Sequence, residues 1–419
     1  MLKFGYAETD ITPYSPIETV GFNRKDNVSR GILKPLFAQV LVCEQADVGC
    51  LITIDSIGFK KELTDNLRNV LCGVLHTSFD KVMICFSHCH SAPNADVATD
   101  YYEMLCGKVE EAVKEAKAKL HEICVGCGNA YANIGVNRRK GNNTLDNRVG
   151  ILKATNSAEE GLVELIVLRV TAHCNSLKRD NYLISPDYFG DIREMLGDYY
   201  NCPIMIIQGA AGNIAPKYFK SEETPVDACG EEYIRSEEAL KDMAEEVLKQ
   251  SIPVIEEIEV DREVDIKMYA KNTVLRAEVP TYEKACLIAE EAKVNCKIDG
   301  EKWLAEIQKL NDCGIAIQEE TVEVQYLKIG KWCICGVPYE LMVEFAIRSA
   351  EMLDDEFFYL NGYTNGCSSY FPTEEEFDMG GYEVYWSMLI YYSYYNRVFP
   401  LVRESASKLL DFIVTNVLK

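Results

Sequence analysis

The sequence predicts an α/β protein with a central, largely parallel or mixed β-sheet flanked by helices, and with a small helical insertion. Three observations support this fold class. Short runs rich in Val, Ile and aromatic residues alternate with segments whose apolar residues recur every three or four positions. Several of these runs end directly in polar residues, as strands do beside a ligand-binding crevice. One stretch around residue 300 is helical in pattern and highly charged.

Five of the apolar runs are predicted strands, and each of them leads into polar side chains. In chain order they are KVMICF (81–86) before His88 and His90, ELIVLRVTA (164–172) before His173, PIMIIQ (203–208) before Gly209–Asn213, KWCICGVP (331–338) before Glu340, and FFYLNGY (357–363), which leads to Tyr370. Ligands bind at the carboxyl ends of the strands in open α/β sheets, so we expect these five ends to converge.

Helical patterns fill the segments between the strands. Residues 100–120 place apolar side chains at three- and four-residue spacing, which predicts an amphipathic helix. Residues from about 280 to 312 predict a charged helical hairpin inserted before the strands return. No repeat of 20 to 50 residues and no low-complexity linker divides the chain. We therefore expect a single domain over residues 1–419.

The charge of the chain excludes several classes of partner. With 43 Lys and Arg against 66 Asp and Glu, the formal net charge is −23, and Lys and Arg form no cluster. Nucleic acid and anionic membrane surfaces are therefore excluded. The N-terminus lacks the apolar stretch of a signal peptide, and no run of about 18 apolar residues occurs, so we expect a cytoplasmic protein without membrane insertion. The sequence leaves a homo-oligomer open.

The seventeen cysteines do not predict a disulfide framework. Their number is odd, they are scattered, and many lie in apolar runs, so we interpret most of them as reduced core residues. Cys124 and Cys127 form one Cys-x-x-Cys pair, but no second pair follows at zinc-ribbon spacing. A metal or redox role for this pair is a minor alternative.

Three of the five histidines, His88, His90 and His173, lie at predicted strand ends. Histidines two residues apart at the end of a strand can point the same way, and a third from another strand can complete a metal site. The alternative is a pair of hydrogen-bonded structural histidines. Asp187 and Asp96 are candidates to accept the second ring N–H of a ligating histidine, with ordinary loop capping as the alternative.

The segments that contain these residues resemble those of a known protein family. FSHCHSAPN (86–94) resembles the His-Thr-His-Ser-Gly-Pro segment of the neutral ceramidases and their bacterial relatives, zinc amidases that cleave the N-acyl bond of ceramide. Further segments are similar to that family in the same order, from Asp10-Ile-Thr-Pro13 through GVNRR (135–139), LDNRVGILK (145–153), VTAHCNSLKRDNYLISPDYFG (170–190), QGAAGNIAP (208–216) and SSYFPTEEEFDMGGYE (368–383). The resemblance covers nearly the whole chain and implies the fold of a neutral ceramidase catalytic domain.

The resemblance also implies a set of site residues. It assigns zinc ligation to His88, His173, Glu340 and Tyr370. It places around the metal-bound water and the scissile carbonyl the side chains of His90, Arg138 and Tyr382. Imidazole, carboxylate and phenolate are acceptable zinc ligands, and zinc lowers the pKa of a bound water to about 7. Two alternatives stay open, namely a surface ion pair for Arg138 and a core position for Tyr382.

Three departures from the family limit what the resemblance implies. Ala215 stands where the ceramidases carry a Ser to which nucleophile or transition-state roles have been attributed, so we expect direct attack by zinc-bound water without an acyl-enzyme. Asn213 replaces an Asp of the same loop. The chain ends at Lys419, soon after the last motif, so we expect no C-terminal immunoglobulin-like domain.

The predicted function is zinc-dependent hydrolysis of a linear amide (N-acyl) bond in a small, polar cytoplasmic metabolite, rather than in long-chain ceramide. A zinc-dependent esterase or lactonase is the first alternative. The second is a metal-stabilised binding protein or inactive relative, which the alanine at position 215 motivates. We interpret the Gly209–Asn213 loop as a wall of the metal cleft, with phosphate binding as a weaker alternative. The tyrosine-rich residues 382–399 line a pocket or, as helical spacing more often indicates, belong to the core.

Overall fold

The computed structural model describes residues 1–22, 24–159, 161–177, 179–217 and 236–418. Its largest element is a mixed sheet of eight strands with the order β11-β9-β8-β6-β1-β3-β4-β5. Only β4–β5 and β9–β11 pair in parallel, and the remaining neighbours are antiparallel. The eight strands are β1 (Lys3–Asp10), β3 (Phe37–Glu44), β4 (Val48–Ile54), β5 (Val82–Phe86), β6 (His121–Tyr131), β8 (Arg148–Asn156), β9 (Val163–Val170) and β11 (Ile204–Gln208).

A second sheet of four strands, in the order β13-β14-β15-β17, packs against the first. Its strands are β13 (Ile266–Glu278), β14 (Ile317–Ile329), β15 (Trp332–Gly336) and β17 (Phe358–Asn361). Three short pairs complete the strands, namely β2 (Gly31–Ile32) with β10 (Leu183–Ile184), β7 (Gly135–Asn137) with β12 (Ile214–Pro216), and β16 (Glu340–Leu341) with β18 (Tyr370–Phe371).

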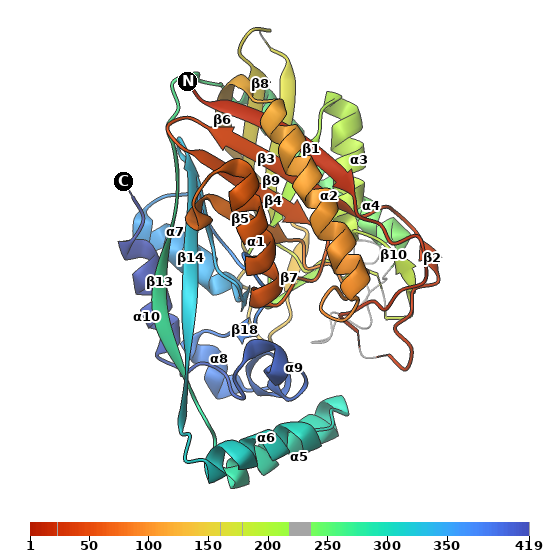
Figure 1. The fold of residues 1–419 in the computed structure, drawn as a ribbon, viewed down its shortest axis with the longest axis vertical. Helices are drawn as coiled ribbons and strands as arrows, with labels where there is room; N and C mark the ends of the chain where they lie inside the picture. Colours follow the sequence, from red (N-terminus) through yellow and green to blue (C-terminus); the bar gives the residue numbers. More distant parts are fainter. Residues whose placement is uncertain (23, 160, 178, 218–235, 419) are drawn as a thin grey trace.

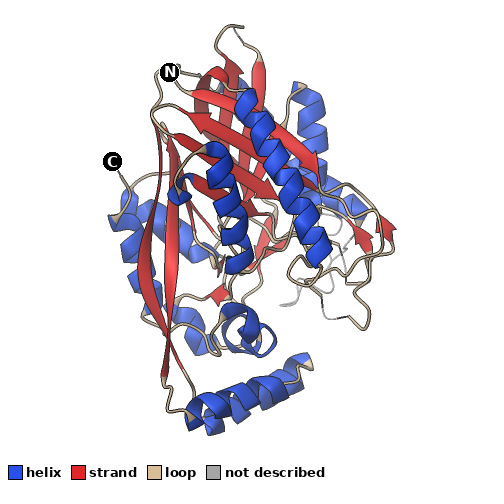
Figure 2. Cartoon of the chain, in the orientation of Figure 1, coloured by secondary structure: helices blue, strands red, loops and turns tan. Residues whose placement is uncertain are grey.

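Helices cover the outer faces of both sheets, so the molecule has four layers (Figure 1, Figure 2). The first sheet is covered by α1 (Lys61–Leu75), α2 (Thr99–Ala118), α3 (Tyr188–Tyr200) and α4 (Glu237–Glu257). The second is covered by α7 (Val343–Leu353) and α10 (Ser405–Thr415). The other helical segments are η1 (Phe79–Lys81), α5 (Tyr282–Cys296), α6 (Glu301–Asp312), α8 (Glu374–Met379), the π-helical η2 (Tyr382–Trp386) and α9 (Met388–Tyr395).

The alternation of side chains along the strands explains these layers. In β9, Ile166 and Leu168 pack under the helices, whereas Leu165 and Val167 face the second sheet. Side chains of a strand point alternately to the two faces, so a strand buried on both faces is a continuous apolar run. The five runs predicted as strands correspond to β5, β9, β11, β15 and β17, and the first sheet is the mixed one of the two predicted forms. The sequence does not reveal that two sheets stack face to face.

The predicted helical hairpin corresponds to α5 and α6, which lie at the far end of the long β13–β14 ribbon (Figure 1). An apolar cluster joins this hairpin to α9 and to the chain that follows it. Trp303 of α6 is fully buried there, and its indole N–H donates to the Val398 carbonyl oxygen at 2.7 Å. The insertion thus packs against the tyrosine-rich residues 382–399.

A buried network of ion pairs and hydrogen bonds links the two sheets near one end. Arg169 of β9 places Nη1 2.6 Å from Asp146 Oδ2, and its Nε donates to Asn361 Oδ1 of β17 at 3.0 Å. Arg148 contacts the same carboxylate, with Nε 2.8 Å from Asp146 Oδ1. Burial alone would raise the pKa of Asp146, but Arg169 and Arg148 lower it to about 2. The first sheet is thereby fixed against β17, close to the strand ends that carry the polar side chains.

No helix in the described ranges combines the length and the apolar character needed to cross a membrane. The cysteines of the described ranges are free, and Cys229 lies outside those ranges. Cys124 and Cys127 lie three residues apart on β6 and thus point to opposite faces of the strand. They do not form a two-thiol metal site.

Candidate metal centre

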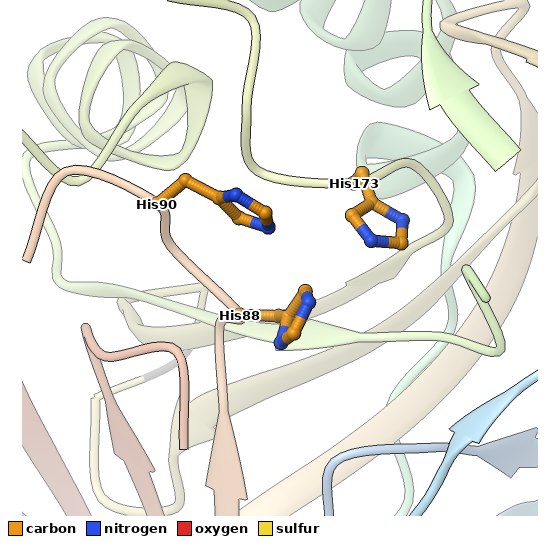
Figure 3. Close-up of side chains that lie close together, drawn as sticks. All are labelled: His88, His90 and His173. Atoms are coloured by element: carbon orange, nitrogen blue, oxygen red, sulfur yellow. The ribbon is translucent and has the colours of Figure 1, made fainter. Parts of the chain in front are cut away.

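The end of β5 and the end of β9 bring three histidines together. His88 follows β5, with a backbone φ of 58° in the left-handed region, and His173 follows β9. The ring centre of His88 lies 5.0 Å from that of His90 and 4.9 Å from that of His173 (Figure 3). One ring nitrogen from each of the three histidines lies within 4.8 Å of the corresponding nitrogens of the other two. The predicted convergence of these strand ends is present in the structure.

Gln208, the last residue of β11, connects the strand ends that carry the histidines. Its Nε2 donates to the carbonyl oxygens of Ala172 at 2.7 Å and of Ser87 at 3.2 Å. Each of those residues directly precedes a histidine of the cluster. The strands β5 and β11 lie at opposite edges of the hydrogen-bonding order, yet they contact each other because the sheet curls. The buried amide of Gln208 holds the two edges together at the site.

Backbone carbonyls fix the orientation of all three rings. The Nδ1 atoms of His88, His90 and His173 lie 2.8, 2.9 and 2.6 Å from the carbonyl oxygens of Ile57, Gly21 and Ala211, respectively. A carbonyl oxygen only accepts hydrogen bonds, so each neutral ring carries its proton on Nδ1. The lone pair of each Nε2 is then free to bind a metal ion, as in proteins whose histidine ligands donate their other N–H to a carbonyl.

Glu340 lies against two of these lone pairs. Its Oε2 is 3.1 Å from His88 Nε2 and 3.3 Å from His173 Nε2. Burial lowers the pKa of His173 to about 4, so that imidazole is neutral at pH 7. A carboxylate oxygen and an imidazole lone pair at this separation repel each other unless a proton or a cation lies between them.

Three atoms of the cluster are buried without a hydrogen-bond partner in the described part of the chain, namely His90 Nε2, His173 Nε2 and Glu340 Oε2. A buried polar atom is costly when it has no partner, and groups of this kind typically bind an ion. Nitrogen and carboxylate oxygen are zinc ligands. The donor set therefore fits the metal that the family resemblance implies.

Tyr370 lies beside Glu340 because β16 and β18 pair in parallel with these two residues opposite each other. Arg138 Nη2 donates to the Tyr370 hydroxyl oxygen at 3.1 Å and to the Gly212 carbonyl oxygen at 2.6 Å. Arg138 Nε is 3.0 Å from Glu383 Oε1, in a largely buried ion pair rather than on the surface. Arg138 thus touches the predicted ligand Tyr370, and it reaches the metal centre through that residue.

Tyr382 begins η2, and its ring centre lies 6.0 Å from that of Tyr370. It lines a cavity of about 110 Å³ that also exposes His88, His90 and Glu340. Further walls of this cavity come from α9 and from the loops after β4 and β5, through Ile57, Lys60, Asn94, Asp96, Tyr391, Tyr394 and Tyr395. The structure therefore brings all seven predicted site residues to one place.

The two predicted carboxylate partners of the histidines are wrong. Asp187 caps α3, accepting from the backbone N–H groups of Tyr188 at 2.9 Å and Leu177 at 3.1 Å. Asp96 accepts from the backbone N–H of Lys60 at 3.1 Å. Both carboxylates serve loop backbones, and carbonyl oxygens take the place that they were expected to fill. Sequence patterns do not reveal such partners, because every residue has a carbonyl.

The Gly209–Asn213 loop forms the wall that was expected beside the metal centre. Its carbonyl oxygens face His173 and Arg138, whereas the N–H groups of Gly209 and Gly212 donate to backbone carbonyl oxygens at 2.7 and 2.8 Å. The N–H groups of Gly209 and Gly212 are therefore not available to a phosphate. Asn213 donates through Nδ2 to Glu344 Oε2 at 3.0 Å and accepts from Val343 N at 2.9 Å.

Tyr363 is a site residue without a predicted role. Its ring is fully buried and stacks on His88, with the ring centres 4.3 Å apart. It has a positive φ of 54°, just after β17, which turns the chain toward the metal centre. In the sequence it belongs to an apolar run and resembles a core aromatic.

Taken together, the four-layer fold and the buried histidine–carboxylate cluster define an α/β protein with a candidate metal centre at its strand ends. The fold is that of the bacterial neutral ceramidases, as the motif resemblance predicts. The neutral ceramidase from Pseudomonas aeruginosa superimposes with a TM-score of 0.70 at 17% identity, over 99% of this chain and 74% of the ceramidase chain. A ceramidase complexed with C2 superimposes with a TM-score of 0.67 at 15% identity, over 91% of this chain and 71% of that one. No protein-family model and no curated protein matches the sequence.

Proposed function

We propose that this protein is a zinc-dependent hydrolase that cleaves the linear amide bond of a small molecule. One observation carries the proposal. Three imidazole Nε2 atoms and one carboxylate oxygen meet in a buried cluster, where backbone carbonyl oxygens hold the Nδ1 atoms and so turn the Nε2 atoms toward one another. The shared fold with ceramidases adds the reaction class, because those structures are of proteins named for cleaving ceramide.

In this proposal His88, His173, Glu340 and Tyr370 hold the metal. When bound, zinc polarises the amide carbonyl and lowers the pKa of a water in its open coordination position. Arg138 donates to the Tyr370 oxygen and so supports the phenolate form of that ligand. Without a cation, burial and then Glu340 raise the pKa of Tyr370 well above its ordinary value.

His90 is the proposed proton carrier. Its Nδ1–H is held by the Gly21 carbonyl, while its Nε2 is unpaired beside the other two rings. Burial, and then His88 and His173, lower the pKa of His90, so its Nε2 is available to accept a proton from the attacking water and pass it to the amine that leaves. The Tyr382 hydroxyl on the cavity wall is placed to donate to the substrate oxygen as negative charge develops there.

Ala215 removes the hydroxyl that could act as a nucleophile in this loop. It lies in β12, opposite Val136 of β7, and is almost fully buried. Water is then the attacking group, and the products form in a single displacement without an acyl-enzyme.

The proposal is tested by hydrolysis of a panel of small N-acyl amides and the matching esters by the zinc-loaded protein. We expect amide cleavage that a chelator abolishes and added zinc restores. His90→Asn should lower amide turnover by about 10²–10⁴-fold, and lower ester turnover less, because an alkoxide leaves more readily than an amine. His121→Asn is the matched control, since that histidine pairs with Glu164 at the surface.

Zinc-replete protein that cleaves esters but no amide would overturn the amide assignment and favour an esterase or lactonase. Protein that binds zinc tightly and cleaves neither would favour the metal-stabilised binding protein.

A further inference from the structure

Among the described residues that line the cavity beside the metal centre, Lys60 is the one lysine or arginine. This residue directly precedes α1, and its backbone N–H donates to Asp96 Oδ1 at 3.1 Å, which fixes its place on the wall. Its ammonium nitrogen lies 4.4 Å from the ring centre of Tyr394, another residue of the same wall. A lysine over an aromatic ring keeps its N–H donors available to a ligand.

The ammonium of Lys60 lacks an ion pair among the residues that the structure describes. The neighbouring Lys61, by contrast, pairs with Asp65 on the surface of α1. Acidic residues outnumber basic ones by 66 to 43 in this chain, so a lysine that faces a cavity without a carboxylate at contact distance needs a separate explanation. A buried or half-buried cation is normally compensated by an anion. Asp96 on the same wall interacts with Lys60 but forms no ion pair at contact distance, so the ammonium is free to bind an anionic group of the substrate.

The size and the other charges of the cavity limit which ligands can place an anionic group beside Lys60. Its volume of about 110 Å³ lies well below the roughly 300–1,000 Å³ of pockets for drug-sized ligands, so the ligand is small. Asp96 also lines the cavity and disfavours an anion on its own side. An anion is therefore favoured at Lys60 and Tyr394, while the histidines and Glu340 belong to the reacting end.

We propose that Lys60 binds a carboxylate of the substrate, so that the amide cleaved is that of an N-acyl amino acid or a similarly small acyl amide with a carboxylate. This inference rests on the proposed function for its reaction and names the substrate class. Lys60 is a specificity-determining residue in it, not a catalytic one.

The test is equilibrium binding by calorimetry, with zinc-loaded His90→Asn protein so that turnover does not interfere. The two probes are N-acetylglycine and N-acetylglycinamide, which differ only in the carboxylate. We expect N-acetylglycine to bind about tenfold more tightly or better, as one charge-assisted contact provides. Adding Lys60→Met should abolish that preference, whereas adding Lys61→Met should leave it unchanged. The preference should also weaken as salt is raised.

Equal binding of the two probes, or no binding of either, would overturn the inference. A preference that persists in the Lys60→Met protein would overturn it too, because the carboxylate would then contact another cation, the metal included. Binding is measured without turnover, so this test is separate from the proposed function. That function fails when the wild-type protein cleaves no amide, whatever the binding preference.

Discussion

Asn213→Asp converts a hydrogen bond beside the metal centre into a contact between two carboxylates. The amide nitrogen of Asn213 lies 3.0 Å from Glu344 Oε2 and 3.2 Å from Oε1, and both residues are buried. An ionised aspartate there would repel Glu344 by about 4 kcal/mol, for charges about 4 Å apart and an effective dielectric constant of about 20. The alternative is that the pair binds one proton on folding.

If the carboxyl pair of the Asn213→Asp variant binds one proton on folding, the stability of the variant depends on pH. At pH 7, protonating a carboxyl whose ordinary pKa is about 4 costs about 4 kcal/mol, and at pH 5 it costs about 1.4 kcal/mol. The shared proton raises the folded-state pKa of the pair above the unfolded value, so the variant loses stability as the pH rises. We expect Asn213→Asp to be about 4 kcal/mol less stable than wild type at pH 7 and to recover most of that loss at pH 5.

Urea unfolding of wild type and variant at the two pH values measures this difference. Asn213→Ala is the control, because it removes the same hydrogen bonds without adding a charge and should destabilise equally at both pH values. Equal destabilisation by Asn213→Asp at pH 5 and pH 7, or none at pH 7, would refute the reasoning. It would mean that the side chain leaves Glu344 or that water screens the pair.

Three further predictions concern the supports of the site. Asp146→Asn should destabilise the protein by about 3–5 kcal/mol at neutral pH, because it leaves the buried Arg169 uncompensated. Since the pKa of Asp146 is lowered from 3.8 to about 2 in the folded protein, wild type should lose about 2 kcal/mol of stability between about pH 4 and pH 2, and the variant should show no such loss in urea titrations. Gln208→Leu should weaken zinc binding about 10–100-fold in competition with a chelating dye, since the amide that holds the residues before His88 and His173 is lost; unchanged affinity would count against that role. Removing the metal with a chelator should lower the melting temperature. If the free zinc concentration is a hundred times the Kd before chelation, the loss corresponds to about 2.7 kcal/mol of stability. An unchanged melting temperature would contradict a metal centre.

The sequence predicts the strands and the site better than it predicts the sheets. Residues 165–168 form a continuous apolar run because both faces of β9 are covered, one by helices and one by the second sheet. A strand that is buried on both faces has the same apolar residue pattern whether helices or a second sheet cover it. This pattern also contains no information on the order of the strands in the sheet. The stacking of two sheets and the contact between β5 and β11 therefore had no signal in the residue pattern.

His88, His90, His173, Glu340 and Tyr370 were identifiable because they follow predicted strands and few residue types bind zinc. Arg138 and Tyr382 were identified only through the resemblance to the neutral ceramidases. The groups that support the site residues were not identifiable for two reasons. The carbonyl oxygens of Gly21, Ile57 and Ala211 hold the imidazoles, and a backbone group has no residue type. Gln208 and Tyr363 are buried at the ends of apolar strands. In the sequence they resemble ordinary core residues, because the sequence does not show which other strand ends lie beside them.

The most direct test of the central claim is the zinc content of purified protein, determined by elemental analysis for wild type beside Glu340→Gln and His121→Asn. Glu340→Gln keeps the shape of the side chain but removes the charge that faces His88 and His173. We expect stoichiometric zinc in wild type and in the surface control, and its loss from Glu340→Gln. Wild-type protein that binds no zinc, or a Glu340→Gln protein that retains it in full, would contradict the account.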